Sequence, residues 1–236
     1  MYSDASISAL ADTSYAEYMS SATLSKNTSA TKLVKTVGQK MVTALEAYLK
    51  AQGQTQYLEG LSWDFKLVAD TSVNAFCLPN GKIVLYDGIV KYANTADFLA
   101  VVIGHEMGHA VARHGNERMS QQALVASAGQ IARSIYSTTN SGQNASNLAI
   151  FDMVFSVGSN LGVILPYSRK HEYEADQIGL YIMSLAGYNV YQAPVFWQKM
   201  SADGSGSAVD FMSTHPSDAN RIANIQAVIA QMEKVK

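Results

Sequence analysis

Two histidines and a glutamate occupy residues 105–109 in the order His-Glu-Met-Gly-His, inside a strongly helical stretch. Positions i and i+4 share one face of a helix, so the imidazoles of His105 and His109 can converge on one metal ion. Glu106 lies about 100° around the helix from His105, where its carboxylate can reach a water on that metal without binding the metal itself. This geometry indicates a zinc site that hydrolyses peptide bonds. The alternative is an ordinary amphipathic helix whose histidines fall four residues apart.

A second set of acidic residues lies in residues 168–179, whose order is Ser-Arg-Lys-His-Glu-Tyr-Glu-Ala-Asp-Gln-Ile-Gly. Glu172 and Asp176 are four residues apart and share a helix face. A catalytic zinc site uses three protein ligands and one open position, and a metal-bound histidine usually donates its second ring N–H to a carboxylate. Glu172 as the third ligand and Asp176 as that acceptor meet both requirements. The alternative is a solvated acidic face, which is what we expect for Glu174.

A long helix must carry the two histidines, and residues 95–114 have the pattern of one. Asn94 or Thr95 can cap its start with a side-chain oxygen, and Gly115 can end it. The apolar run at residues 98–103 continues the helix into a core. We therefore expect a buried metal-binding helix at residues 95–114.

A second helix must bring the third ligand to the histidines, and residues 168–187 start with an N-capping serine and end with a glycine. Gly104 and Gly108 lie four apart on the first helix and form a smooth stripe beside the histidines. Ala175 and Gly179 are small residues on the second helix. Small residues on both sides predict that the two helices pack very closely.

These motifs, taken with their flanking segments, resemble the gluzincin metallopeptidases that include HtpX and the CAAX prenyl proteases. Upstream, residues 74–88 are similar to the segment that precedes the metal helix in that family. Downstream, residues 214–222 contain Thr-His-Pro-Ser followed by Arg-Ile, which is similar to the closing element of the family. The resemblance covers about residues 70–225 and is greatest to small soluble bacterial envelope members such as the LoiP-like lipoprotein proteases.

The resemblance implies a zincin fold of the minigluzincin type with one Zn²⁺ per chain. It implies that His105, His109 and Glu172 bind the zinc. It also implies that Glu106 is the catalytic base and that Asp176 orients a ligand histidine. Substrates would be polypeptides, unfolded or misassembled.

His215 has two possible roles at such a site, and Arg221 would stand beside it. A His215 imidazole could donate to the developing oxyanion of the reaction. Alternatively it could occupy the open zinc position in a resting state and swing away on a flexible linker at residues 202–207. A His-Pro pair before a helix is also ordinary helix-start chemistry. We expect His114 and His171 to be exposed residues at helix ends.

The composition predicts a single globular domain over residues 1–236, with residues 1–30 peripheral or weakly ordered. The chain is 48% hydrophobic and 15% charged. Its net charge of −2 argues against a nucleic-acid partner, which would require a clearly basic surface. Residues 148–165 are the nearest candidate for a membrane span, but polar residues interrupt them. A span requires roughly 18–20 uninterrupted apolar residues. This segment predicts a core or lid helix, or alternatively an interfacial one. Cys77 is expected to be a small buried residue in a strand.

No export signal is visible at the start of the sequence. The family resemblance nevertheless predicts a periplasmic or cell-envelope protein, with a cytoplasmic one as the alternative. Membrane association would then require a lipid anchor that this chain does not contain.

The remaining elements give an α+β fold that is mostly α-helical, with a small β-sheet beside the metal-binding helix. Further helices are predicted at residues 32–51, 118–136, 191–200 and 217–235, a loop at 137–147, and strands at 63–68, 73–78 and 83–86. Pro79-Asn80-Gly81 is a turn signal that makes the last two strands a hairpin. One edge of this hairpin, at Asn74, Ala75 and Phe76, could hold an extended substrate peptide by β-addition.

The residues therefore predict a zinc-dependent metalloendopeptidase, and the resemblance implies that it acts in envelope protein quality control. The alternative function is a zinc-bound chaperone or assembly factor of the same fold that has lost turnover. Glu106 is intact in this chain, which favours the enzyme because an inactive descendant commonly loses its base.

Overall fold

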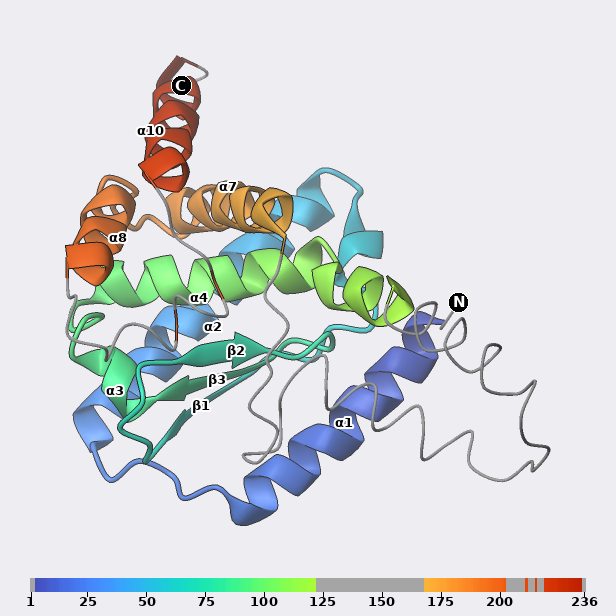
Figure 1. The fold of residues 1–236 in the computed structure, drawn as a ribbon. Helices are drawn as coiled ribbons and strands as arrows, with labels where there is room; N and C mark the ends of the chain where they lie inside the picture. Colours follow the sequence, from blue (N-terminus) through green and yellow to red (C-terminus); the bar gives the residue numbers. More distant parts are fainter. Residues whose placement is uncertain (1–2, 122–167, 203–210, 212–214, 216–218, 235–236) are drawn as a thin grey trace, which may run out of the picture.

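Two helices packed side by side form the centre of the protein. They are α4 (Ala96–Val111) and α7 (Arg169–Leu185), and they make the most extensive contact between described elements. The computed structural model describes residues 3–121, 168–202, 211, 215 and 219–234. In Figure 1, α4 crosses the middle of the molecule with α7 on one side and a small sheet on the other. The predictions for residues 137–147 and 148–165, most of the helix at 118–136 and nearly all of the linker at 202–207 fall outside the described residues.

The sheet has three strands, namely β1 (Asp64–Val68), β2 (Ala75–Cys77) and β3 (Lys82–Tyr86), in the order β1-β3-β2. β2 and β3 pair in antiparallel fashion and β1 pairs in parallel with β3. Gly81 adopts a φ of 84° in the turn before β3, a conformation that glycine adopts without strain. The predicted hairpin and the predicted strand before it are confirmed.

Helices cover both faces of the sheet. α2 (Thr28–Ala51) and α4 pack on one face, and α1 (Asp4–Ser21) packs on the other (Figure 1). The Tyr15 hydroxyl of α1 donates to Asp64 of β1 over 2.8 Å. α2 begins four residues earlier than predicted because Asn27 caps it through its side chain. Of the two alternatives for residues 1–30, a packed peripheral helix is the one observed.

The remaining described elements are short or lie at the end of the chain: a 3₁₀ helix (Thr55–Leu58), α3 (Asp87–Val90), α8 (Gln192–Ala202) and α10 (Ala219–Lys234). α8 and α10 match the helices predicted at residues 191–200 and 217–235. α8 packs against α4, and α10 packs against α7 and α8. The α+β, mostly helical fold class is thus confirmed.

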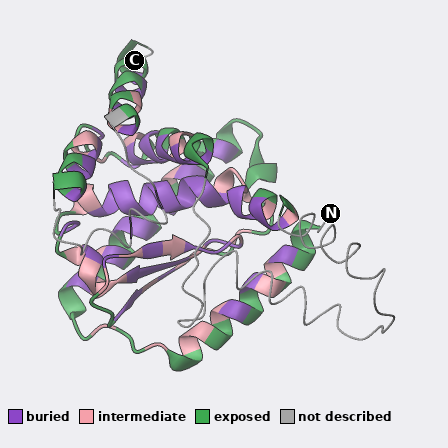
Figure 2. Cartoon of the chain, viewed as in Figure 1, coloured by how far each residue is buried: buried purple, intermediate pink, exposed green. Residues whose placement is uncertain are grey.

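The metal-binding helix is buried on every side. Each residue of α4 from Leu99 to Ala110 is buried, and Figure 2 shows this helix as a continuous buried segment. A helix buried all round belongs in a core, so its polar residues must find partners there. Thr95 caps the start as predicted. The predicted end is wrong: α4 stops at Val111, and Arg113, not Gly115, adopts the left-handed conformation with a φ of 57°.

Glycines allow α4 and α7 to touch backbone to backbone, as the small-residue pattern predicted. A Cβ placed on Gly108 would lie 2.4 Å from the carbonyl oxygen of Ala175. A Cβ on Gly179 would lie 2.7 Å from the carbonyl carbon of Gly104. Both distances are shorter than van der Waals contact, so any side chain at Gly108 or Gly179 must push the helices apart. This close approach sets how far the acids of α7 stand from the histidines of α4.

We expect Gly108→Ala to destabilise the metal-free protein by about 1–3 kcal/mol, the usual cost of overpacking a core. The variant should also bind zinc more weakly, because α7 must move away from the histidines. Urea unfolding of the apoprotein measures the first effect. Gly104→Ala is the matched comparison, since its added carbon would lie 3.1 Å from its nearest neighbours and should cost less. Equal stability of Gly108→Ala and the parent would contradict the close helix contact.

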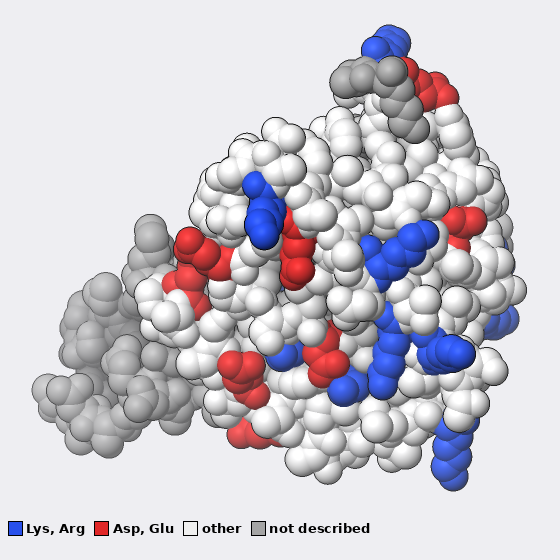
Figure 3. Space-filling model, turned by 180° about the vertical axis from the view of Figure 1, so that it is seen from behind, with Lys and Arg blue, Asp and Glu red and all other residues white. Residues whose placement is uncertain are grey.

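Charged side chains of both signs lie on the surface, and Figure 3 shows acidic groups interspersed with basic ones on the face behind the view of Figure 1. Among the helices of the described residues, none is long and apolar enough to cross a membrane.

Candidate metal centre

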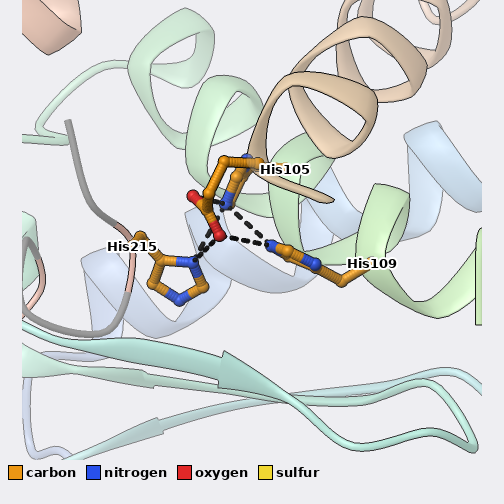
Figure 4. Close-up of side chains that lie close together, drawn as sticks. His105, His109 and His215 are labelled. Atoms are coloured by element: carbon orange, nitrogen blue, oxygen red, sulfur yellow. Dashed lines mark hydrogen bonds and ion pairs between the residues drawn. The ribbon is translucent and has the colours of Figure 1, made fainter. Parts of the chain in front are cut away.

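Four buried side chains from three parts of the chain meet at one point. His105 and His109 come from α4, Glu172 comes from α7, and His215 comes from the segment that precedes α10. Figure 4 shows the three histidine rings pointing toward one another. One ligand atom from each of the four residues lies within 4.8 Å of the others. The structure therefore brings together the three ligands predicted from the sequence and places beside them His215, for which the sequence left two roles open.

The distances between these atoms fit a zinc ion. His105 Nε2 lies 3.1 Å from His109 Nε2 and 3.3 Å from Glu172 Oε2, and His109 Nε2 lies 3.3 Å from Glu172 Oε1. Tetrahedral ligands at about 2.0–2.1 Å from zinc stand about 3.3 Å from one another. Both oxygens of the buried Glu172 carboxylate face the cluster, and the Arg221 guanidinium lies 2.9 Å from Oε2. The donor set of two imidazoles and a carboxylate is one that zinc accepts.

The charge around the site also favours a cation. Burial and the Arg221 charge lower the pKa of His105, but Glu172 and Asp176 outweigh them and raise it to about 9. Burial raises the pKa of Glu172, yet the neighbouring His215 and His105 side chains hold it well below its usual range. Burial lowers the pKa of His109 well below its usual range. The site thus combines an ionised carboxylate with imidazole nitrogens, the donor types that zinc binds.

Asp176 and Arg221, which the sequence placed next to the ligands, lie beside His105. The Nδ1 atom of His105 lies 2.9 Å from Asp176 Oδ1, which leaves Nε2 of the same ring facing the metal position. Arg221 donates to both oxygens of Asp176, over 2.6 Å from Nε and 2.9 Å from a terminal nitrogen. Burial raises the pKa of Asp176, but the Arg221 charge lowers it below its usual value.

The fully buried Arg221 side chain connects α10 to α7, to α8 and to the segment that carries His215. Its guanidinium lies 2.9 Å from Glu172 Oε2 and donates to the backbone carbonyl of His215 over 3.2 Å. It also stacks on Trp197 of α8, 3.6 Å from the ring centre. Trp197 in turn stacks on Phe211. No sequence pattern singles out Trp197, since nothing in a helix pattern distinguishes a core tryptophan from one that contacts a site.

His215 lies where a fourth ligand would be. Its Nδ1 is 3.1 Å from His105 Nε2 and 3.3 Å from Glu172 Oε1. Its other nitrogen, Nε2, is 3.4 Å from Glu106 Oε1. Glu106 is buried beside the ligand cluster but is not part of it, and its Oε1 atom lacks a hydrogen-bond partner. A ligand position and the predicted base therefore both face His215.

The prediction that His114 and His171 are exposed is wrong. Both side chains are buried, and their rings stack with centres 4.3 Å apart. Nδ1 of His114 lies 3.0 Å from Nδ1 of the candidate ligand His109. Glu174 is half-exposed, as expected, but its carboxylate is 3.4 Å from Nε2 of His114. For His114 the prediction failed because the sequence pattern predicted one helix up to residue 114, whereas α4 ends at Val111.

The candidate substrate strand β2 lies beside α4. The backbone carbonyl of Asn74 accepts a hydrogen bond from the backbone N–H of Tyr86, so the backbone groups of Asn74 face β3. Successive residues of a strand alternate, so the backbone N–H and C=O of Ala75 face away from β3. The Phe76 ring packs against Tyr18 and Tyr86, on the α1 face of the sheet and away from the histidines. Cys77 is a buried strand residue, as predicted.

Comparisons with known proteins match most of the chain. The sequence model of peptidase family M48 matches residues 29–229. The mitochondrial metalloendopeptidase OMA1 of Arabidopsis thaliana is 39% identical over 172 residues, which are 73% of this chain and 33% of that protein. OMA1 of Homo sapiens is 30% identical over 183 residues, covering 75% of this chain and 34% of the relative. The beta-barrel assembly-enhancing protease of Escherichia coli is 27% identical over 176 residues, covering 71% and 34%.

The chain spans between a third and about half of the length of the first OMA1 relatives, at 33%, 47% and 53%. These relatives are OMA1 enzymes and a beta-barrel assembly-enhancing protease, whereas the motifs alone suggested HtpX, the prenyl proteases and LoiP-like members.

Proposed function

Since the chain belongs to peptidase family M48, we propose that it is a zinc-dependent metalloendopeptidase. The observation that carries this proposal is the cluster of His105, His109 and Glu172 with interatomic distances of 3.1–3.3 Å, next to the buried Glu106 carboxylate, whose Oε1 makes no hydrogen bond. Ligands alone would suit a structural site. A carboxylate placed beside them without binding suits hydrolysis.

Each residue of the proposed site has a distinct task. When bound, zinc supplies a Lewis acid that polarises the scissile carbonyl and increases the acidity of water. Glu106 then acts as general base and acid: its free oxygen takes a proton from the attacking water and passes it to the leaving amine. The Asp176 carboxylate accepts from His105 and fixes the orientation of that ring, while Arg221 holds Asp176 in place.

Metal-dependent cleavage of an unfolded protein is the direct test of the proposed activity. The purified chain loaded with one equivalent of zinc should cleave casein, and a chelator should stop the cleavage until zinc is restored. Casein suits the test because an endopeptidase of unfolded chains needs no specific recognition site. Stoichiometric zinc binding without any cleavage would contradict the enzyme and favour the alternative, a zinc-bound chaperone or assembly factor.

For His215 we propose the role of a displaceable fourth ligand. This role is supported by the 3.1 Å and 3.3 Å distances from its Nδ1 to two other ligand atoms. In that place the ring fills the position that substrate and water require, so it must move before the reaction. The alternative is that His215 donates to the oxyanion. The two roles predict opposite effects of removing the ring.

His215→Ala should raise the turnover of casein if the imidazole blocks the fourth position. If the imidazole stabilises the oxyanion instead, the same change should lower turnover by about 10²–10³-fold. Initial rates with saturating zinc separate the two outcomes. A variant with unchanged turnover and unchanged zinc affinity would exclude both roles. His171→Phe is the control, because it replaces a buried histidine outside the cluster and keeps a ring stacked over His114.

We further propose that a substrate peptide adds to β2 as an extended strand. β2 is an edge of the described sheet and lies beside the helix that carries the candidate base. The backbone of Ala75 faces away from β3, and its N–H donates to the Asn74 side chain over 2.9 Å, a bond that a substrate strand would replace. Main-chain pairing of this kind accepts varied sequences. Phe76 would contribute through its position in the strand, since its side chain points to the other face.

Substrates and location follow from the same proposal. Unfolded or misassembled polypeptides are the substrate class that backbone pairing and a buried zinc site suit. An envelope location is supported by the likeness to a protein named beta-barrel assembly-enhancing protease, while other relatives are named mitochondrial. The LoiP-like likeness remains a prediction from the motifs.

A further inference from the structure

His114 reaches the ligand His109 only because the helix breaks between them. In a continuous α-helix, residues five apart are about 140° away from each other around the axis, so their side chains diverge. α4 ends at Val111, and Arg113 takes a left-handed conformation with a φ of 57°. The next helical segment starts at His114. The turn brings the His114 ring under His109, with 3.0 Å between the two Nδ1 atoms.

Long-range contacts hold this unusual turn in place. A left-handed conformation is uncommon for a residue other than glycine, and it persists where the surroundings impose it. The Arg113 guanidinium pairs with Asp4 of α1 and donates to the backbone carbonyls of Gln56 and Glu59 over 3.5 Å and 3.4 Å. Two separate segments thus fix the one residue that redirects the chain toward His109. The position of His114 is therefore a property of the tertiary structure.

The two α4 histidines use their rings in the same way. Each presents Nε2 to the metal position and turns Nδ1 away from it. A neutral imidazole that binds metal through Nε2 carries its proton on Nδ1 and needs an acceptor there. His105 has the Asp176 carboxylate as that acceptor. For His109, Nδ1 of His114 lies 3.0 Å from Nδ1, and it can accept only if the His114 proton is on Nε2, facing Glu174 at 3.4 Å.

His171 closes the other side of this arrangement. Its ring lies nearly parallel to that of His114, at 23°, and its Nε2 is 3.2 Å from Glu117. The stacked ring shields the His109–His114 contact from water. Protein electrostatics and hydrogen bonds are stronger where water is excluded.

We propose that His114 is a positioning residue for the metal ligand His109, accepting its Nδ1–H and passing the hydrogen-bond chain to Glu174. This inference rests on the proposed zinc site and extends it with a residue that does not touch the metal. The acceptor fixes both the orientation of the His109 ring and the tautomer that leaves Nε2 available. Partners of this kind typically change metal affinity or activity by about 10–100-fold when removed.

Two amides distinguish the two ends of the His114 ring. An asparagine oxygen can occupy the place of Nδ1, so His114→Asn keeps an acceptor for His109 and loses the contact with Glu174. A glutamine reaches the place of Nε2, so His114→Gln keeps the Glu174 end and removes the acceptor that His114 offers to the His109 N–H. His114→Phe keeps the ring volume and removes both. His171→Phe is the matched control, since it preserves a ring over His114.

Zinc affinity of the metal-free proteins, measured by competition with a chromophoric chelator, is the readout. We expect His114→Phe and His114→Gln to bind zinc about 10–100-fold more weakly, and His114→Asn and His171→Phe to stay within a few-fold of wild type. Circular dichroism and urea unfolding of the apoproteins show whether the fold is kept. Wild-type affinity of His114→Phe, or equal losses in Asn and Gln, would overturn the positioning role. A wild-type chain that binds no zinc would instead refute the proposed function, and this inference with it.

Discussion

Glu106→Gln should lower casein cleavage by about 10²–10⁴-fold, the range that a positioned general base contributes. Zinc binding should stay at one ion per chain, because Glu106 lies beside the ligand cluster and is not part of it. Glutamine keeps the shape and the burial of the side chain but cannot take a proton. Zinc content after dialysis and initial cleavage rates, measured on the same preparation, test both halves of this expectation.

Glu172→Gln is the control for that experiment. It makes the same chemical change on the neighbouring helix, but to a side chain whose two oxygens each lie 3.3 Å from a ligand nitrogen. This variant should lose zinc affinity directly, and activity should fall for that reason. If Glu106→Gln lost zinc and Glu172→Gln kept it, the two roles would have been assigned to the wrong residues.

Arg221→Met should destabilise the protein by about 3–5 kcal/mol, because it leaves buried carboxylates without their counter-charge. Arg221 is fully buried, it donates twice to Asp176, and it lies 2.9 Å from Glu172. Methionine fills a similar volume, so a cavity contributes little to the loss. Urea unfolding of the apoprotein at neutral pH measures the change in the free energy of unfolding.

The double variant Arg221→Met with Asp176→Asn separates charge from packing. Removing the orphaned carboxylate charge should restore part of the lost stability, whereas a packing defect would remain or grow. Arg221→Lys should fall between the parent and Arg221→Met, since an ammonium keeps the charge but not the two-pronged contact. A loss below about 1 kcal/mol in Arg221→Met would mean that these ion pairs contribute no more than surface pairs do.

The sequence alone predicted the two central helices and three of the side chains that meet between them. The reason is that these features are local. His105 and His109 share a face because of helix periodicity. Thr95 and Ser168 cap their helices by accepting a hydrogen bond from the backbone N–H three residues further along the chain. The glycine stripe likewise depends only on a spacing of four.

The position of His114 could not be predicted from the local sequence pattern. A uniform helical pattern through residue 114 predicted an exposed helix end, and the chain instead turns at Arg113. That turn depends on Asp4 and on two carbonyls more than fifty residues away along the chain. A backbone angle imposed by distant partners leaves no periodic signal in the sequence.

Short sequence motifs therefore determined which residue types form the site, while the packing of the helices determined how those residues are placed in space. Residue types and spacings of three to four determined the metal-binding helix, the acidic helix and the class of metal. Only the tertiary structure decided that His215 stands 3.1 Å from His105, that Arg221 joins three elements, and that His114 supports His109. These contacts join residues from separate elements, so they depend on how helices pack in a core and not on any local pattern.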